Sequence, residues 1–478
     1  MRQPTVGLIT FGDERAHEWE AVFRGLTEPR HAQVRSSLDA YPVELCSSAS
    51  VARTKDEIDG QVEALRNAGV DVLIAHLPCW TAPNLVVRAV QALNVPTVLL
   101  SNRSAATHGT VALLGAGGAL DQIGYPHLRV REDPSDSAGR AALLPFVRAA
   151  AAVSGLRGEV FGMFGGRSLG IDTGTFDPMQ WRAQFGIDVE HIDQLEIIRR
   201  ADAIGEDRGA TAATWLTDRV GATEFKGKLT PEKLNYQVRC FLATKELIKE
   251  KGLDFVAVKC MPDLSTHFVP QCISAAMLPS PYDEEGPRDS IVMSCEADGD
   301  GALTAEILKH VSGGLPTLFA DVSFLNDATD TLYLPNCGAM CSWFAARSDD
   351  PAENLKQITL RPAIRPGGGA NTYFHAAPGP ITLARLFRRS GKYHMAILPA
   401  RLVEPSVEEI DAFVVARGPH QLPTAFAKLE VGLDRLIEEL GSNHISGVPG
   451  DHVAELEQVC RLLSIVPIVL DDSKPVTA

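Results

Sequence analysis

The sequence predicts an α/β protein with two Rossmann-like, doubly wound parallel-sheet domains followed by a β-rich C-terminal domain. In residues 1–157, apolar runs of strand length alternate with amphipathic segments, and this alternation builds a parallel sheet with helices on both faces. Residues 158–314 repeat the alternation. In residues 315–478, long strand-like segments are joined by Gly and Pro, which is typical of antiparallel strands. We therefore expect three domains with these boundaries.

The first domain begins with clear local signals. Residues 5–11 (TVGLITF) are predicted to form a buried strand. Residues 54–69 are predicted to form an amphipathic helix, because Thr54 can cap its first turn, Glu57 follows three residues later and Gly69 ends it. A strand followed by such a helix is the basic unit of a parallel sheet.

Two further predicted strands, 71–77 and 97–102, continue the sheet of the first domain. Ligands of such sheets bind beyond the carboxyl ends of the strands. Arg15 in the segment GDER and Trp80 in the segment PCW follow strand ends, so we expect both on the functional rim.

The second domain restarts the pattern at 159–166 (EVFGMFGG), after an Ala-rich stretch. A long helix is predicted over 230–252, with Pro in its first turn. In the third domain, 365–387 and 392–403 are predicted to be antiparallel strands, because Gly/Pro turns separate them.

Charge and composition exclude several classes of protein. The 478 residues carry a net charge of −15, which repels phosphate backbones and anionic membranes, so nucleic acid is not an expected partner. No apolar run reaches the length of about eighteen residues that a membrane span needs, and no signal peptide is evident, so we expect a cytoplasmic protein. The nine cysteines are an odd number and several lie in apolar segments, which favours reduced thiols.

Two carboxylates and one imidazole are the candidate metal ligands. Glu296 follows the apolar run IVMSC, Asp321 follows TLFA, and His444 ends the segment GSNH. Divalent cations that prefer oxygen bind such ligand sets and leave room for substrate oxygens. Buried carboxylates are costly unless a metal or another cation compensates their charge. If the three side chains meet, they form the centre of a metal-dependent enzyme that acts on a hydroxylated substrate.

The acidic run at Glu296, Asp298 and Asp300, followed by Gly301, resembles the beginning of a calcium loop. An EF-hand needs Asp at its first position and a bidentate Glu at its twelfth, where this sequence has Glu296 and Ile307. A strand-like segment rather than a helix precedes the run. We therefore exclude an EF-hand and interpret Glu296 as a single carboxylate at a strand end, on a strand that neighbours the one before Asp321.

Other motifs do not support different chemistry. Residues 115–124 (GAGGALDQIG) lack the last Gly of a dinucleotide fingerprint. Cys337 and Cys341 have no second pair to complete a zinc site, so they are expected to be core thiols. His375 competes with His444 as a ligand, but its strand context favours a structural role, whereas His444 is expected in a loop before the last helix.

Residues 165–202 (GGRSLGIDTGTF and onward) resemble the segment that opens the second domain of the L-fucose isomerase family, within the broad group that includes L-arabinose isomerase. The similarity returns in order along the chain at IVMSCEAD, FADV and GSNH. It implies Mn²⁺ or another divalent cation held by Glu296, Asp321 and His444. The first two of these residues are implied to be the catalytic carboxylates that also shuttle the proton.

The resemblance also implies a homo-oligomer, with a hexamer as the expected form, whose sites are completed by the N-terminal domain of a neighbour. Arg15 and Trp80 are then substrate contacts from an adjacent subunit, and Asn443 matches the polar residue before the ligand histidine. Lys259 occupies a position that elsewhere binds a neutral hydroxyl. It either holds an anionic group of the substrate or forms a salt bridge with a neighbouring residue, and the sequence leaves both open.

The expected function is a metal-dependent aldose–ketose isomerase that acts on an open-chain sugar, similar to L-fucose or D-arabinose, through an ene-diolate intermediate. An isomerase or lyase for an anionic sugar derivative on the same scaffold is an alternative, favoured if Lys259 holds an anion. A non-catalytic sugar-binding protein is a second alternative, because the βαβ pattern of the first half resembles periplasmic-type binding folds.

Overall fold

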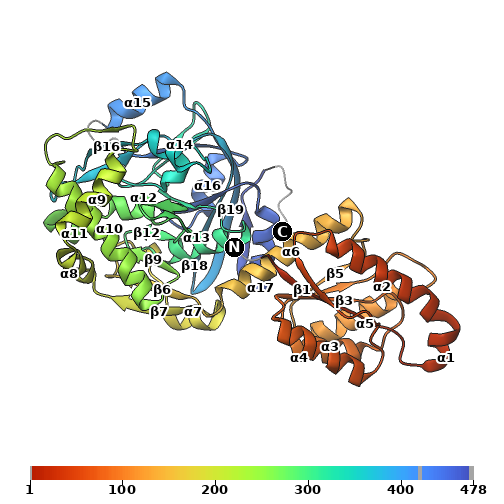
Figure 1. Cartoon of the computed structure of the whole chain (residues 1–478). Helices are drawn as coiled ribbons and strands as arrows, with labels where there is room; N and C mark the ends of the chain where they lie inside the picture. Colours follow the sequence, from red (N-terminus) through yellow and green to blue (C-terminus); the bar gives the residue numbers. More distant parts are fainter. Residues whose placement is uncertain (1–2, 418–421, 473–478) are drawn as a thin grey trace. The chain divides into compact units, whose positions relative to one another are not determined.

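The computed structural model describes residues 3–417 and 422–472. The chain forms two compact units (Figure 1). The first comprises the chain up to Gly155 together with Ala454–Leu463, and the second comprises Leu156–Val453 and the chain from Ser464 onward. The expected division into three domains, with boundaries after residues 157 and 314, stays a prediction.

The first unit is built on a parallel sheet, as its alternating pattern predicts. Neighbouring strands pair in parallel, and the order of the strands is β2-β1-β3-β4-β5. The strands are β1 (Thr5–Thr10), β2 (Glu44–Ser47), β3 (Val72–His76), β4 (Thr97–Leu100) and β5 (His127–Val130). Strand β1 lies inside the sheet, and all six of its residues are buried.

Helices cover both faces of this sheet, so the doubly wound prediction is confirmed for the first unit. One apolar cluster joins the sheet to α3, α4 and α5, and a second joins the opposite face to α2 and α6. The helices of this unit are α1 (Ala16–Glu18), the π-helix η1 (Trp19–Phe23), α2 (Arg24–Asp39), α3 (Lys55–Ala68), α4 (Pro83–Leu93), α5 (Gly109–Gln122), α6 (Ser137–Leu156) and α17 (Val453–Leu462).

Local capping signals set helix ends where the sequence predicts them. In α3, the Thr54 side chain accepts the N–H of Glu57, the Glu57 carboxylate accepts the N–H of Thr54, and Gly69 ends the helix with a φ of 65°. The long helix α10 (Pro231–Lys251) also begins after a Thr cap, because the Thr230 side chain accepts the N–H of Lys233, and Pro231 occupies its first position. Both helix predictions are confirmed.

A second parallel sheet begins the second unit. Its strands pair in the order β12-β9-β6-β7 and are β6 (Val160–Phe164), β7 (Asp188–Ile192), β9 (Phe255–Val258) and β12 (Met293–Cys295). The helices along this part of the chain are η2 (Asp172–Gly174), α7 (Pro178–Gln184), α8 (Leu195–Ala203), α9 (Glu206–Thr217), α10, α11 (Asp263–His267), α12 (Cys272–Met277) and α13 (Gly299–Val311).

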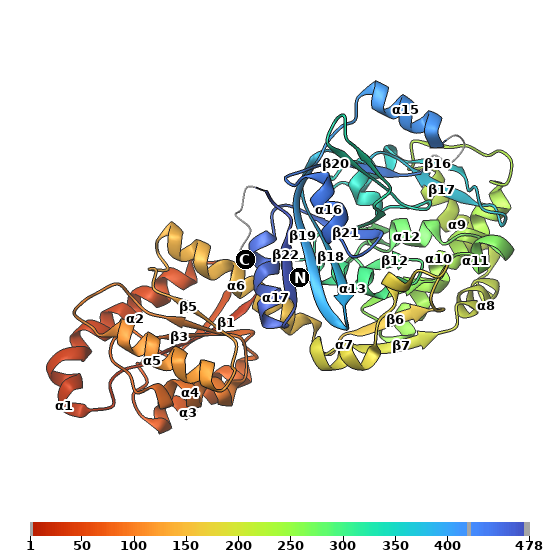
Figure 2. The ribbon, with the colours of Figure 1, turned by 180° about the vertical axis from the view of Figure 1, so that it is seen from behind.

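The β-rich part of the second unit is a curled sheet, and the β-rich prediction is confirmed. Its pairing order is β13-β21-β18-β19-β20-β15-β14, all antiparallel, and β22 adds a parallel pairing with β19. The hairpin of β18 (Gly379–Arg389) and β19 (Lys392–Leu402) is the longest part of this sheet (Figure 2). The other strands are β13 (Leu318–Asp321), β14 (Phe324–Asn326), β15 (Thr331–Pro335), β20 (Thr424–Leu429), β21 (His444–Pro449) and β22 (Val466–Val469).

Short elements complete the second unit. A small sheet has the order β17-β16-β8, and a two-stranded ribbon pairs β10 with β11. The remaining elements are β8 (Ala222–Thr223), β10 (Tyr282–Asp283), β11 (Gly286–Pro287), the 3-10 helix η3 (Ser342–Ala345), α14 (Pro351–Lys356), β16 (Thr359–Pro362), β17 (Ala370–Tyr373), α15 (Val407–Arg417) and α16 (Leu433–Glu439).

Helix α13 is the central element of the second unit. It packs against β9 and β12 of the parallel sheet and against β18 and β21 of the antiparallel sheet. Every residue from Gly299 to Leu308 is buried, because a helix between two sheets has no face left for solvent. The polar groups at its N-terminus therefore lie inside the protein.

Two expectations from composition are met in the described residues. No helix among them is both long and apolar enough to cross a membrane. All nine cysteines are free thiols and seven of them are buried, in agreement with the expected reduced state.

Candidate metal centre

Strand pairing brings Asp321 and His444 together. Asp321 is the last residue of β13, His444 is the first residue of β21, and the antiparallel register places them directly opposite each other. Directly opposed residues of an antiparallel pair have side chains on the same face, about 5 Å apart at Cβ. The expectation that His444 lies in a loop is wrong, because the pairing with β13 makes it part of a strand.

Glu296 reaches the same place from the other sheet. It follows β12, and both Glu296 and Ala297 have left-handed backbone conformations, with φ values of 61° and 55°. Such a conformation costs roughly 1–2 kcal/mol for each residue that is not Gly. The Ala297 N–H donates to the Val258 carbonyl at 3.1 Å, which helps to hold the turn. The strands before Glu296 and Asp321 therefore belong to different sheets, and the expectation that they are neighbours is wrong.

The three candidate ligands converge. Nε2 of His444 lies 3.0 Å from Oε2 of Glu296 and 3.3 Å from Oδ1 of Asp321. One ligand atom from each residue lies within 4.8 Å of the other two. The side chains of His444 and Glu296 are 1% and 8% exposed and that of Asp321 is 35% exposed, so the group opens to solvent on the side of Asp321. Two carboxylate oxygens and an imidazole nitrogen at this spacing fit a divalent cation such as Mn²⁺.

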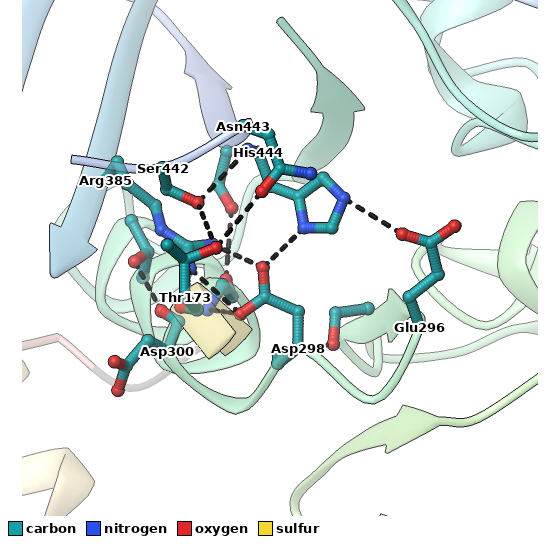
Figure 3. A network of polar contacts seen from close by, with 12 residues as sticks. Thr173, Glu296, Asp298, Asp300, Arg385, Ser442, Asn443 and His444 are labelled. Atoms are coloured by element: carbon teal, nitrogen blue, oxygen red, sulfur yellow. Dashed lines mark hydrogen bonds and ion pairs between the residues drawn. The ribbon is translucent and has the colours of Figure 1, made fainter. Parts of the chain in front are cut away.

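Asp298 sets the orientation of the histidine. Its Oδ2 lies 2.7 Å from Nδ1 of His444, so Nδ1 carries the proton of a neutral imidazole and Nε2 is free to bind a cation (Figure 3). Asp298 also accepts two hydrogen bonds from the Arg385 guanidinium, at 2.5 and 3.0 Å, and both side chains are fully buried.

The charges around Asp298 keep it ionised. Burial alone would raise its pKa, but the Arg385 guanidinium and the hydrogen bond to His444 hold the pKa well below its usual range. Burial would lower the pKa of His444, yet the carboxylates of Asp298, Asp321 and Glu296 raise it well above 6.5. A proton and a cation therefore compete for Nε2 of His444.

Thr173, in the segment 165–202, contacts two residues next to this centre. The Thr173 carbonyl accepts a hydrogen bond from Arg385 at 2.6 Å, and the Thr173 hydroxyl donates to the Asn443 side chain at 3.1 Å (Figure 3). A Cβ on Gly174 would lie 3.1 Å from the Asp298 Cα, so a larger residue there would require a small shift of the backbone at Asp298.

Asp298 and Asp300, which belong to the run that resembles the beginning of a calcium loop, bind other protein groups, in agreement with the exclusion of an EF-hand. The Asp298 side chain caps α13 by accepting the N–H of Gly301 at 2.8 Å. Asp300 accepts a hydrogen bond from the Tyr393 hydroxyl at 2.7 Å, and burial raises its pKa to about 7.

Two segments of the chain match domains of a known family. Residues 3–158 match the first N-terminal domain of L-fucose isomerase, and residues 334–469 match its C-terminal domain. The chain belongs to the L-fucose isomerase family. This confirms the expected family and, with it, the expectation of an enzyme of the sugar isomerase class.

Several proteins named as sugar isomerases are similar to this chain. A sulfoquinovose isomerase of Alkalicoccus urumqiensis is 23% identical over 441 residues, which cover 90% of each chain. A sulfoquinovose isomerase of Clostridium sp. (strain MSTE9) is 29% identical over 226 residues, 46% of each chain. An L-fucose isomerase of Escherichia coli (strain 55989 / EAEC) is 24% identical over 293 residues, 54% of this chain and 49% of that protein. The last two alignments thus span about half of those relatives.

A cavity of about 320 Å³ opens beside the candidate metal ligands. Glu296, Asp321 and Asn443 line it, and so does Arg365, in the loop between β16 and β17. The sequence analysis did not assign Arg365, Asp298 or Arg385 to this site. For Asp298 a signal existed, since it is the acidic residue two positions after Glu296 in the predicted turn.

The other predicted site residues have varied surroundings. Lys259 forms an ion pair with Asp263 at 2.7 Å and is not among the residues that line the cavity. In the first unit, Arg15 is half exposed and pairs with Asp13 at 2.6 Å, while Trp80 packs beside the cluster around Trp19. Their contact with a neighbour's site stays a prediction.

His375, the competing ligand, is not part of the metal-ligand group. Its Nε2 lies 3.1 Å from the Tyr373 hydroxyl, and it forms an isolated bridge with Thr424. The expected structural role agrees with these contacts.

Proposed function

We propose that this protein is a metal-dependent aldose–ketose isomerase that acts on an open-chain sugar. The observation that carries the proposal is the convergence of Glu296, Asp321 and His444 beside a cavity of about 320 Å³, which Glu296 and Asp321 line. A cavity of this volume is within the usual range for a small-molecule site.

Glu296, Asp321 and His444 would hold the cation, with Mn²⁺ as the expected ion. When bound, the cation supplies Lewis acidity that polarises the sugar carbonyl. The donor set supports this assignment, because two carboxylates balance the charge of a divalent ion and the imidazole adds a neutral nitrogen. Asp298 keeps Nε2 of His444 directed at the two carboxylates through its own bond to Nδ1.

The carboxylates also provide the acid–base groups of the reaction. Aldose–ketose interconversion moves a proton between C1 and C2, and a second proton between the oxygens on these carbons. One of Glu296 and Asp321 takes the C2 proton and returns it to C1. The other carboxylate transfers the proton between the oxygens on C1 and C2. Both line the cavity, and Asn443 beside them offers an amide to a sugar hydroxyl.

Two substrate classes follow from the relatives. The similarity to L-fucose isomerases supports a neutral sugar, and L-fucose and D-arabinose are the expected candidates. The relative whose alignment covers 90% of both chains is a sulfoquinovose isomerase, which favours a sulfonated sugar. We further propose a homo-oligomer in the cytoplasm, with a hexamer as its expected form, in which Arg15 and Trp80 complete a neighbour's site.

The proposal is tested with L-fucose, D-arabinose and sulfoquinovose, each incubated with Mn²⁺-loaded protein in D₂O and followed by NMR. We expect a ketose product from at least one sugar, deuterium at C1 or C2, and loss of turnover after chelation with EDTA. Glu296→Gln should abolish isomerisation with the fold intact, whereas the exposed Glu353→Gln on α14 should behave as wild type. Turnover by Glu296→Gln at the wild-type rate would refute the assignment.

A further inference from the structure

The geometry points to Arg365 as the residue that binds an anionic group of the sugar, so that the substrate class is a monoanionic sugar, with a sulfonate as the group that fits best. This inference rests on the proposed function, because it assigns the substrate of the same cavity. It also replaces Lys259, the cation that the sequence suggests for this role.

Arg365 shares the cavity with the candidate metal ligands. Glu296 and Asp321 lie on its wall together with Asn443, and Arg365 comes from the loop between β16 and β17. An open-chain sugar whose C1 and C2 lie beside the carboxylates extends its remaining carbons into this same space. A charged group at the far end of the sugar is therefore within the reach of a cavity-lining guanidinium.

Arg365 has no counter-charge in the described part of the chain. Its side chain makes no ion pair or hydrogen bond there, whereas Lys259 is neutralised by Asp263 at 2.7 Å and Arg385 by Asp298 at 2.5 Å. Two carboxylates and a divalent cation at the metal centre sum to zero charge. The guanidinium of Arg365 then leaves the cavity with one positive charge, and a monoanionic substrate balances it.

The backbone of the Arg365 loop is held in place. Within the loop, the Gly368 N–H donates to the Arg365 carbonyl at 3.1 Å. Two more hydrogen bonds join the loop to neighbouring segments: the Gly367 N–H donates to the Ser265 carbonyl at 2.9 Å, and the Gly369 N–H donates to the Lys228 carbonyl at 3.0 Å. A side chain on Gly367 would come within 2.3 Å of the Phe268 carbonyl oxygen, so the loop depends on glycine for this approach. The arginine is thus presented from a fixed backbone, which lowers the entropic cost of binding.

The chemistry of arginine selects the ligand group. A guanidinium offers parallel N–H donors that match two oxygens of a sulfonate, carboxylate or phosphate. A phosphate monoester carries about 1.5 to 2 negative charges near neutral pH, more than the cavity balances. A sulfonate carries one, and a sulfoquinovose isomerase aligns with 90% of this chain.

The test measures binding separately from turnover. Sulfoquinovose and its neutral counterpart 6-deoxyglucose are reduced to open-chain alditols, which cannot isomerise, and their Kd values for Mn²⁺-loaded protein are measured by calorimetry. Wild type is compared with Arg365→Gln, Arg365→Lys and Lys259→Gln, and with Arg361→Gln as a matched control. Arg361 belongs to β16, close to Arg365 in sequence, but pairs with Glu224 and does not line the cavity.

We expect Arg365→Gln to raise the Kd of the sulfonated alditol about 10- to 100-fold, the range for a lost charge-assisted hydrogen-bonded pair, with a far smaller change for the neutral alditol. Arg365→Lys should recover part of the loss, and Arg361→Gln should match wild type. Carboxylated and phosphorylated alditols, measured in parallel, should bind more weakly than the sulfonated one. Tighter binding of either would refute the choice of a sulfonate.

Three results would overturn the role of Arg365: an equal loss for charged and neutral alditols in Arg365→Gln, no loss for either, or a selective loss in Lys259→Gln instead. Failure of the proposed isomerase is a separate outcome. In that case, the wild type would bind the sulfonated alditol selectively and Arg365→Gln would lose this binding, but the wild type would convert none of the sugars.

Discussion

Replacement of Asp298 by Asn tests the link between the metal centre and the interior of the second unit. Asp298 lies between Nδ1 of His444 and the Arg385 guanidinium, and it caps α13. Asn keeps the shape of the side chain and its capping oxygen but removes the negative charge. When its oxygen keeps the capping position, its NH₂ group replaces Oδ2 and faces both the Arg385 guanidinium and Nδ1 of His444, which are donors themselves.

The structure sets the size of the effect. Arg385 and Asp298 are both fully buried, and leaving one partner of a buried ion pair without the other costs about 3–5 kcal/mol. Loss of the hydrogen bond that orients a ligand histidine lowers metal affinity by about 10- to 100-fold. We therefore expect Asp298→Asn to bind Mn²⁺ at least about 10-fold more weakly and to unfold at a lower temperature.

The assay is competition for Mn²⁺ with a fluorescent chelator, together with thermal unfolding followed by circular dichroism. Asp300→Asn is the control, because Asp300 is a buried carboxylate in the same turn that bonds Tyr393 instead of His444. It should retain the wild-type affinity for Mn²⁺. Wild-type affinity in Asp298→Asn, at unchanged pH, would refute the view that Asp298 positions the imidazole.

Two further predictions concern pH. The pKa of Asp300 is raised to about 7 from 3.8, so the folded state binds the extra proton and the wild-type free energy of unfolding should fall by about 1.4 kcal/mol per unit as pH rises from 4 to 7. Asp300→Asn should lack this slope in urea unfolding, and an unchanged slope would contradict the burial argument. In the first unit, burial lowers the pKa of His76 to about 3 from 6.5, so stability should fall as pH drops below 6.5, by about 3 kcal/mol at pH 4.5. His76→Gln should show a correspondingly smaller loss between pH 7.5 and 4.5, and identical losses in the two proteins would exclude His76 as a source of acid sensitivity.

Local features of the fold were predictable because local sequence encodes them. The helix after Thr54 and the helix after Thr230 have caps within a few residues of their ends, so the caps can be read in a short window. The alternating apolar pattern in the first unit likewise matches one buried sheet with helices on both faces.

The errors concern pairing between distant segments. His444 carries turn-forming neighbours, yet pairing with β13 makes it a strand residue. The two carboxylate strands are close in sequence, but α13 separates them into two sheets. Strand pairing depends on contacts between segments far apart in the chain, and no local pattern contains that information.

The sequence by itself determined the class of fold through its apolar periodicity and the family through the resemblance of several segments. It also predicted the chemical types of the candidate metal ligands from residues at strand ends. Tertiary structure alone decided which charges meet. It placed Asp298 between His444 and Arg385 and paired Lys259 with Asp263. It also left Arg365 without an ion-pair partner among the described residues, beside Glu296 and Asp321 in one cavity. The physical reason is that a charge acts over a few ångströms, and only folding brings residues from separate segments to that distance.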